Sequence, residues 1–167
     1  PYSFVKNGVI ISVMSFGARQ REPIYARYIF KYHPYFKDVK IFFGEEKLDG
    51  VPYCIEGGDF HILSEDTVAI GISQRTTAGS VQIVGRRLAK EAGIRTVLAV
   101  DIPKHRAYMH LDTVFTMVDW DAFTIFPGVA DRIRVWELSY DEGGNLVQID
   151  ESRNLVESLK KSLHLDQ

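Results

Sequence analysis

Cysteine, basic charge and long apolar runs are all scarce in this sequence. The 167 residues include one cysteine, and the formal net charge is −2. A single cysteine excludes an internal disulfide framework and is typical of a reducing compartment, so we expect a cytoplasmic location. The charge leaves no basic surface for nucleic acid, so we expect no nucleic-acid partner. The apolar runs are too short for a membrane span and no signal-peptide pattern opens the chain, so we expect no membrane association.

The remaining composition is that of a globular protein. The hydrophobic fraction is 46%, enough apolar surface to offset the entropy cost of folding. The length suits a single domain over residues 1–167. The first residue is Pro1, and we interpret the chain as a piece of a longer product, with N-terminal processing as the alternative.

The spacing of apolar residues predicts an α/β fold. We expect helices over Glu22–Tyr32, Gly79–Ala92 and Glu151–Leu163, with Gly93 ending the second. We expect strands over Val9–Met14, Lys40–Phe43, Asp59–Leu63, Thr67–Ile72, Arg95–Val100, Thr113–Val118, Ala122–Phe126, Arg132–Leu138 and Leu146–Ile149. The middle of this order is β-β-α-β. No strand follows the last helix, so we expect an unpaired sheet edge and self-association, as a homo-oligomer or through such edges.

Two acids flank a pair of glycines in IEGGDF, residues 55–60. Consecutive glycines allow positive φ and a sharp turn, which would expose Glu56 at the end of an element. The alternative is a tight connection that carries two solvated acids, Glu56 and Asp59.

Arginines occupy two positions that need an explanation. Arg75 lies in GISQRT, residues 71–76, between a strand and a helix, where sites collect in α/β folds. Its guanidinium can bind a carboxylate through two hydrogen bonds. Arg19 and Arg21 precede a helix whose N-terminus does not favour cations, so an anionic ligand would explain them. The alternative at all three positions is a solvated arginine.

A histidine and an acid lie two residues apart in MHLDT, residues 109–113. If this segment is extended, His110 and Asp112 point to the same side. They would then place a general acid/base beside an anionic anchor. The alternative is one hydrogen-bonded histidine at the start of a strand. Together, the acids, arginines and histidine suit a substrate such as free arginine, whose cation the acids would hold and whose carboxylate the arginines would hold.

Four stretches, in this order and spacing, resemble the arginine deiminases of the guanidino-group-modifying (pentein) superfamily. They are ARQRE (18–22), IEGGD (55–59), GISQRT (71–76) and MHLDTVFTMVD (109–119). The resemblance extends from Asn7 to the last helix. It implies a partial α/β propeller of about three ββαβ modules, the last one incomplete. Residues 1–167 would then be a single domain, a fragment of the arginine deiminase catalytic domain.

The resemblance also implies an activity and a set of residue roles. The activity is hydrolysis of L-arginine to L-citrulline and ammonia through a covalent cysteine intermediate, without metal or cofactor. By position, His110 resembles the general acid/base, and Glu56 and Asp112 resemble the acids that bind the guanidinium and orient the histidine. Arg19 and Arg75 resemble the residues that bind the substrate carboxylate. A histidine among acids should have a raised pKa.

Two family motifs have no counterpart in this sequence. These are the Gly-rich segment with the nucleophilic cysteine and a Thr-Arg-Asp motif. Cys54 does not match the nucleophile by position, and we interpret it as a small buried apolar residue. We therefore expect the chain alone to be inactive. The alternatives are a related amidinotransferase or agmatine deiminase, or a non-catalytic binding remnant. Arg19 and Arg75 argue against agmatine, which has no carboxylate.

Overall fold

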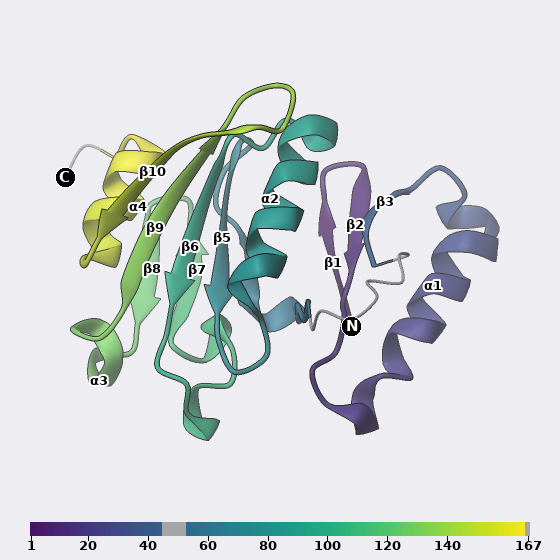
Figure 1. The fold of residues 1–167 in the computed structure, drawn as a ribbon, viewed down its shortest axis with the longest axis horizontal. Coiled ribbons are helices and arrows are strands. Elements are labelled where there is room, and N and C mark those ends of the chain that lie inside the picture. Colours follow the sequence, from purple (N-terminus) through teal and green to yellow (C-terminus); the bar gives the residue numbers. More distant parts are fainter. Residues whose placement is uncertain (45–52, 166–167) are drawn as a thin grey trace.

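The computed structural model describes residues 1–44 and 53–165, which form a layered α/β fold (Figure 1). Helix α1 covers a three-stranded sheet, helix α2 lies between that sheet and a five-stranded one, and helix α4 lies at the far side. The helices are α1 (Glu22–Tyr32), α2 (Ala78–Ala92), α3 (Pro127–Ala130) and α4 (Leu155–Leu163). The strands are β1 (Tyr2–Val5), β2 (Gly8–Ile11), β3 (Lys40–Phe43), β4 (Phe60–Ile62), β5 (Thr67–Ile72), β6 (Thr96–Asp101), β7 (Phe115–Asp119), β8 (Ala122–Ile125), β9 (Arg134–Tyr140) and β10 (Leu146–Ser152).

The five-stranded sheet has the order β10-β9-β6-β5-β4. Strands β5 and β6 are parallel and α2 connects them, whereas β4, β9 and β10 pair antiparallel with their neighbours. The order β4-β5-α2-β6 confirms the expected β-β-α-β arrangement. Strands β9 and β10 extend this same sheet, and β7 and β8 form a separate hairpin.

The two central strands are apolar on both faces because both faces are covered. Val68 and Ile70 of β5 belong to the core on the α2 side, while Ala69 between them belongs to the core on the α4 side. In β6, Leu98 likewise faces the α4 side and Val97 faces α2. This alternation anchors β5, whose C-terminal end leads into the GISQRT segment.

Helix α2 begins and ends nearly where the sequence predicts. The hydroxyl of Thr77 accepts a hydrogen bond from the backbone N–H of Ser80 and so caps the N-terminus. Gly93 follows the last turn with φ +69°, the left-handed conformation that glycine adopts without strain. The expected stop at Gly93 is therefore confirmed.

The three-stranded sheet has the order β1-β2-β3, with β2 and β3 parallel and α1 connecting them. Val9 and Ile11 of β2 pack against Ala26 and Phe30 of α1. Beyond β2, the backbone of Val13 exchanges two hydrogen bonds with that of Ile55, of 3.0 and 3.1 Å. This isolated bridge joins the first sheet to the segment that carries Glu56.

Several predicted bounds differ from the structure, most clearly at the N-terminus and at the start of the last helix. The sequence analysis did not predict β1, and the strand expected over Val9–Met14 ends at Ile11. Helix α4 begins at Leu155 instead of Glu151, because β10 continues to Ser152 and the side chain of Asn154 caps the helix.

Among the described residues, no helix combines the length and the apolar character that crossing a membrane requires.

Truncating a side chain in the central sheet should destabilise the fold. Leu98 is fully buried in β6, so Leu98→Ala should lower the free energy of unfolding by roughly 2–5 kcal/mol through lost burial and a cavity. Val147→Ala, at a side chain that is 63% exposed on β10, should change it by about 0.5 kcal/mol or less. Urea denaturation followed by circular dichroism measures both, and equal effects would contradict the description of the core.

Candidate active site

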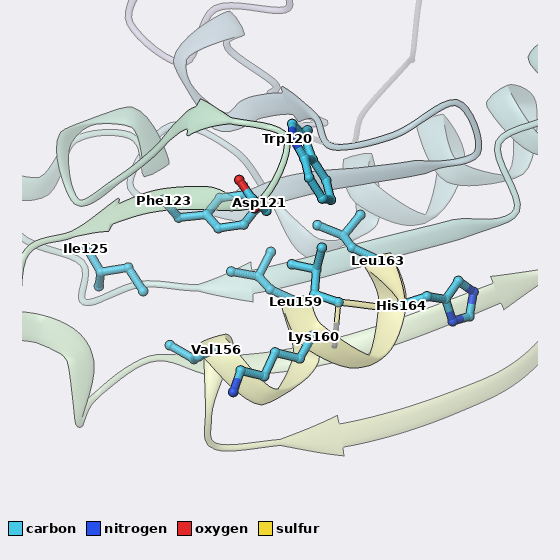
Figure 2. A pocket seen from close by; sticks show the side chains of 10 residues that line it. Trp120, Asp121, Phe123, Ile125, Val156, Leu159, Lys160, Leu163 and His164 are labelled. Atoms are coloured by element: carbon cyan, nitrogen blue, oxygen red, sulfur yellow. The ribbon is translucent and has the colours of Figure 1, made fainter. Parts of the chain in front are cut away.

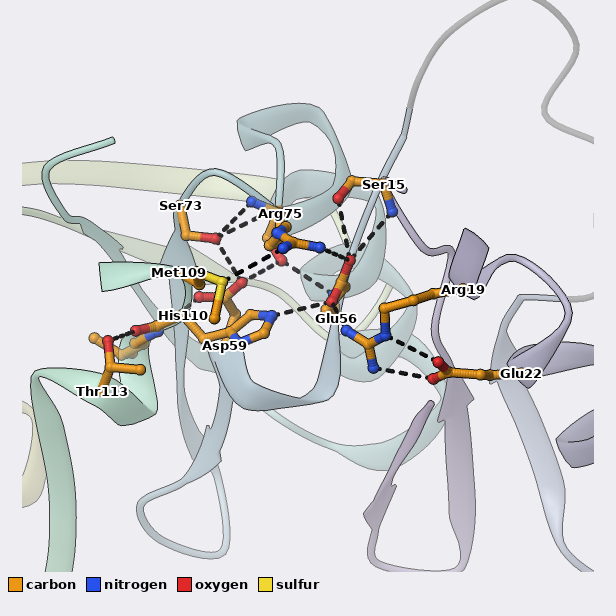
Figure 3. Close-up of polar contacts among 12 residues, drawn as sticks. Ser15, Arg19, Glu22, Glu56, Asp59, Ser73, Arg75, Met109, His110 and Thr113 are labelled. Atoms are coloured by element: carbon orange, nitrogen blue, oxygen red, sulfur yellow. Dashed lines mark hydrogen bonds and ion pairs between the residues drawn. The ribbon is translucent and has the colours of Figure 1, made fainter. Parts of the chain in front are cut away.

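Three of the predicted segments meet beside the end of β5 (Figure 3). Glu56 follows the bridge residue Ile55, Arg75 lies in the turn between β5 and α2, and His110 lies in the loop after β6. A fourth segment, the 3-10 turn Gly17–Arg19, brings Arg19 to the same place. The structure thus brings together Arg19, Glu56, Arg75, His110 and, as described below, Asp112.

Glu56 is the most contacted member of the cluster. Its Oε1 accepts hydrogen bonds from the backbone N–H and the hydroxyl of Ser15, at 3.2 and 3.1 Å. Its Oε2 accepts from Arg19 Nη1 at 2.7 Å and lies 3.0 Å from His110 Nε2. The side chain is 1% exposed, so the expectation of an exposed Glu56 was wrong. The bridge at Ile55 and the surrounding donors bury it.

The charge of Glu56 is stabilised in spite of its burial. Burial alone would raise its pKa, but the hydrogen bonds from His110 and Ser15 and the positive charge of Arg19 outweigh that effect and lower the pKa to about 2. Glu56 is therefore a permanent anion at neutral pH.

His110 has the opposite shift. Its hydrogen bond to Glu56 raises its pKa, burial opposes the rise, and the negative charges of Asp59, Glu56 and Asp112 add to it. This confirms the expected direction. The imidazole stays protonated to a higher pH than an ordinary histidine does, as a general acid near neutral pH requires.

The second of the paired glycines, Gly58, makes room for the side chains of the cluster. Neither Gly57 nor Gly58 has a positive φ; both lie in a 3-10 turn, Gly57–Asp59. A Cβ on Gly58 would lie 2.6 Å from Asp112 Oδ2 and 2.9 Å from His110 Cγ. The predicted reason for the glycines, a turn with positive φ, was therefore wrong, and the role of Gly58 is the space that a side chain would occupy.

His110 and Asp112 lie together, although the backbone differs from the expected extended strand. Leu111–Thr113 is a 3-10 turn, and only His110 itself is extended, with φ −140° and ψ 165°. Both side chains nevertheless lie over Gly58. Asp112 is exposed, so it stands at the solvent side of the cluster.

Both arginines face Glu56 in this structure. Arg19 bridges Glu56 and Glu22, with two 2.9 Å hydrogen bonds to the latter. The Arg75 guanidinium stacks 3.9 Å above the Phe16 ring, and its Nη1 lies 3.6 Å from Glu56 Oε1. Nε and Nη1 of Arg75 are buried and have no hydrogen-bond partner among the described residues. Binding of a substrate carboxylate by these arginines stays a prediction.

Cys54 lies two residues before Glu56 and is partly exposed, so the interpretation of a buried residue was wrong. Burial and the neighbouring charge of Glu56 raise the pKa of its thiol. Nucleophilic cysteines have lowered pKa values, so the shift at Cys54 is opposite to the one that activates a thiol.

The sequence analysis noticed Asp59 but gave it no role. Its carboxylate is fully buried and accepts hydrogen bonds from Ser73, Thr76 and the backbone of Leu111. Gly71, a glycine inside a buried strand, is the signal that could have revealed it, because a Cβ there would collide with Asp59 Oδ1.

A separate pocket lies between the β7–β8 hairpin and α4 (Figure 2). Trp120, Phe123 and Ile125 line one side, and Leu159 and Leu163 line the other. No predicted site residue borders this pocket.

Among residues 1–44 and 53–165, no three His, Cys, Asp or Glu side chains are grouped so that they could hold a metal ion.

The fold places the chain in a known class of α/β protein. A crystal structure of a dimethylarginine dimethylaminohydrolase adduct with 4-chloro-2-hydroxymethylpyridine is similar, with a TM-score of 0.53. The match covers 75% of this chain and 45% of that chain at 21% sequence identity, so it concerns the fold. The chain therefore shares its mixed α/β fold with that enzyme.

The chain belongs to the arginine deiminase family, whose family model matches residues 1–167. The arginine deiminase of Clostridium perfringens is 40% identical over 172 residues, 99% of this chain and 41% of that protein. Those of Streptococcus gordonii and Staphylococcus aureus are 40% and 37% identical, again over 99% of this chain. The chain thus spans about two fifths of the length of these relatives.

Acid should weaken the contribution of Glu56 to stability. Its folded pKa of about 2 lies below the ordinary value of 4.5, so its stabilisation is present above pH 4.5 and is lost as the pH falls toward 2. Glu56→Gln should therefore be less stable than wild type at pH 6, and the difference should shrink between pH 4.5 and 2. Urea denaturation at several pH values measures this. Glu65→Gln, at an exposed acid, is the control, and a difference that stays constant with pH would contradict the assignment.

Proposed function

We propose that this chain provides the proton-transfer and substrate-binding part of an arginine deiminase active site. The supporting observation is that one buried carboxylate oxygen, Glu56 Oε2, contacts both the His110 imidazole and the Arg19 guanidinium. A guanidinium bound there lies directly beside the group that would transfer its protons. The reaction is hydrolysis of L-arginine to L-citrulline and ammonia, with no metal or other cofactor.

Substrate recognition follows from the charges of the site. Glu56 and Asp112 bind the substrate guanidinium, and the substrate replaces Arg19 on Glu56. Arg75 and Arg19 bind the substrate carboxylate. For Arg75 this is supported by its two buried N–H groups that lack a hydrogen-bond partner among the described residues, because buried donors cost free energy until an acceptor arrives.

The chemistry then proceeds in two halves. A cysteine thiolate attacks the guanidinium carbon and forms a C–S bond, and protonated His110 gives its proton to the departing nitrogen, which leaves as ammonia. Neutral His110 then removes a proton from water, whose oxygen attacks the same carbon. The C–S bond breaks, the thiolate is restored, and the remaining hydroxyl proton passes to solvent, which leaves the neutral urea group of citrulline. Fixed carboxylates hold the delocalised cation while this occurs.

The nucleophile belongs to a part of the protein outside these 167 residues. Cys54 has a raised pKa, and the relatives are about two and a half times as long as this chain. We propose that residues 1–167 form a single domain of about three propeller modules within a longer, cytoplasmic protein. That protein forms homo-oligomers or self-associates through its exposed sheet edges.

Two other functions compete with this proposal. An agmatine deiminase or an amidinotransferase would use the same Glu56–His110 pair, and a non-catalytic remnant would keep it without turnover. The buried Arg75 donors favour a substrate that has a carboxylate, which agmatine lacks.

The activity can be tested on the natural protein and on the 167-residue chain. The natural protein, purified from its source, should release citrulline and ammonia from L-arginine and should prefer arginine to agmatine. The 167-residue chain, free of any longer protein, should release neither because it lacks an activated cysteine. A colorimetric assay measures citrulline release by both samples. Intact-mass measurement shows that the short sample contains no longer protein. Preference for agmatine would refute arginine as the substrate. Turnover by the 167-residue chain would refute the proposal that the nucleophile lies outside it.

Arg75→Ala in the natural protein should act on arginine selectively. Loss of charge-assisted hydrogen bonds to the carboxylate should lower kcat/KM for arginine by roughly 10- to 100-fold. Any slow turnover of agmatine should change far less, because agmatine has no carboxylate to bind. Arg106→Ala, at an exposed arginine, is the matched control. Equal losses for the two substrates would mean that Arg75 acts only through Glu56.

A further inference from the structure

Asp59 is the most buried acid near the site, with 0% of its surface exposed. Its Oδ2 accepts hydrogen bonds from the hydroxyls of Ser73 and Thr76, each at 2.7 Å. Its Oδ1 accepts from the backbone N–H of Leu111 at 2.8 Å. One side chain therefore joins the Gly57–Asp59 turn to two other segments of the chain.

Each of these partners is one step from a predicted site residue. The Thr76 hydroxyl also accepts from the backbone N–H of Glu56, at 3.1 Å. The Ser73 hydroxyl accepts from the backbone N–H of Arg75, at 2.9 Å. Leu111 lies between His110 and Asp112. The three segments that carry Glu56, Arg75 and His110 thus meet at a single carboxylate.

Burial raises the pKa of Asp59, and the hydrogen bonds from Thr76, Ser73 and Leu111 oppose that rise because they favour its ionised form. Both hydroxyls already accept from backbone N–H groups, so each has its own proton free to donate to the carboxylate. The third contact is also a donor, the N–H of Leu111. The absence of a side chain at Gly71 keeps the space for Oδ1 open. Three hydrogen-bond donors surround the carboxylate and Gly71 leaves space for it, so these residues form a preorganised site for one anion.

We propose that Asp59 is a positioning residue, which fixes the separations between Glu56, Arg75 and His110 through the Ser73, Thr76 and Leu111 hydrogen bonds. The role of Asp59 in catalysis rests on the proposed arginine deiminase function. Its effect on the geometry of the cluster is independent of that function. The negative charge of Asp59 also adds to the raised pKa of His110, together with the charges of Glu56 and Asp112.

The competing explanation is a purely structural one, in which Asp59 stabilises the core and has no influence on the site. The two explanations differ in what happens to His110. When the Asp59 charge is kept and only one of its hydrogen bonds is removed, a structural role predicts a less stable protein with an unchanged imidazole. A positioning role predicts a changed imidazole in a protein that is still folded.

The titration of His110 in the 167-residue chain separates them. Histidine-labelled protein is titrated by NMR, and the His110 signal is assigned through His110→Gln. Asp59→Asn should move the His110 midpoint to lower pH, because it removes a nearby negative charge and loosens the Glu56 contact. Glu65→Gln should leave it in place. An unchanged midpoint in a folded Asp59→Asn chain would overturn the proposal.

A second pair of variants keeps the test valid if Asp59→Asn does not fold. Thr76→Val keeps the shape of the side chain but removes the hydroxyl that links Glu56 to Asp59, whereas Thr76→Ser keeps that hydroxyl. The Val variant should lower the His110 midpoint and the Ser variant should preserve it. If the His110 midpoint in both variants equals that of the wild-type chain, the proposal is overturned.

Activity of the natural protein then tests the catalytic meaning. Thr76→Val should lower kcat by roughly 10- to 100-fold through displaced groups, with a smaller change in KM, and Thr76→Ser should restore it. If the wild-type protein does not hydrolyse arginine, the proposed function fails while the NMR result still decides the role of Asp59. If it does, and kcat is unchanged in the Val variant, the positioning role fails.

Discussion

A buried negative charge organises this part of the molecule. The Glu56 carboxylate is 1% exposed, and a carboxylate without water must find its compensation inside the protein. That compensation comes from Ser15, Arg19 and His110, which lie 41, 37 and 54 residues away along the chain. Both sheets and the loop after β6 must therefore be in place before this charge is stable. Formation of the Glu56 contacts therefore fixes these segments relative to one another.

Space is the second constraint, and two glycines meet it. Gly58 leaves room for His110 and Asp112, and Gly71 leaves room for Asp59. Both positions lack the positive φ that usually explains a glycine. Close approach of side chains to the backbone is the common cause, and it is also why a strand as apolar as β5 tolerates a glycine near its end. Two carboxylates of this site, those of Asp112 and Asp59, thus each lie over a residue that has no side chain.

The sequence predicted the regular elements better than the site geometry. Helix α1 and strand β5 have the predicted bounds because their apolar spacing is local and unambiguous. The 3-10 turn Leu111–Thr113 was not predictable, because it depends on a hydrogen bond from Leu111 to Asp59 across 52 residues. The burial of Glu56 was missed for the same reason. Residue types identified which groups belong to the site, whereas distant contacts decide how each one is held.

The occupant of Glu56 in this structure is itself informative. Arg19 presents to Oε2 the same chemical group as the proposed substrate, a guanidinium, at 2.7 Å and beside His110 Nε2. It is held at the same time by two hydrogen bonds to Glu22. In the proposed binding step a substrate guanidinium displaces Arg19, which would keep the Glu22 contacts and need not return to water as an unpaired charge. The exchange replaces one guanidinium by another on the same buried acid, so the charge balance that stabilises Glu56 is the same before and after binding. A site that must stay neutral in a low-dielectric environment can in this way be ready for a cation without exposing an uncompensated carboxylate.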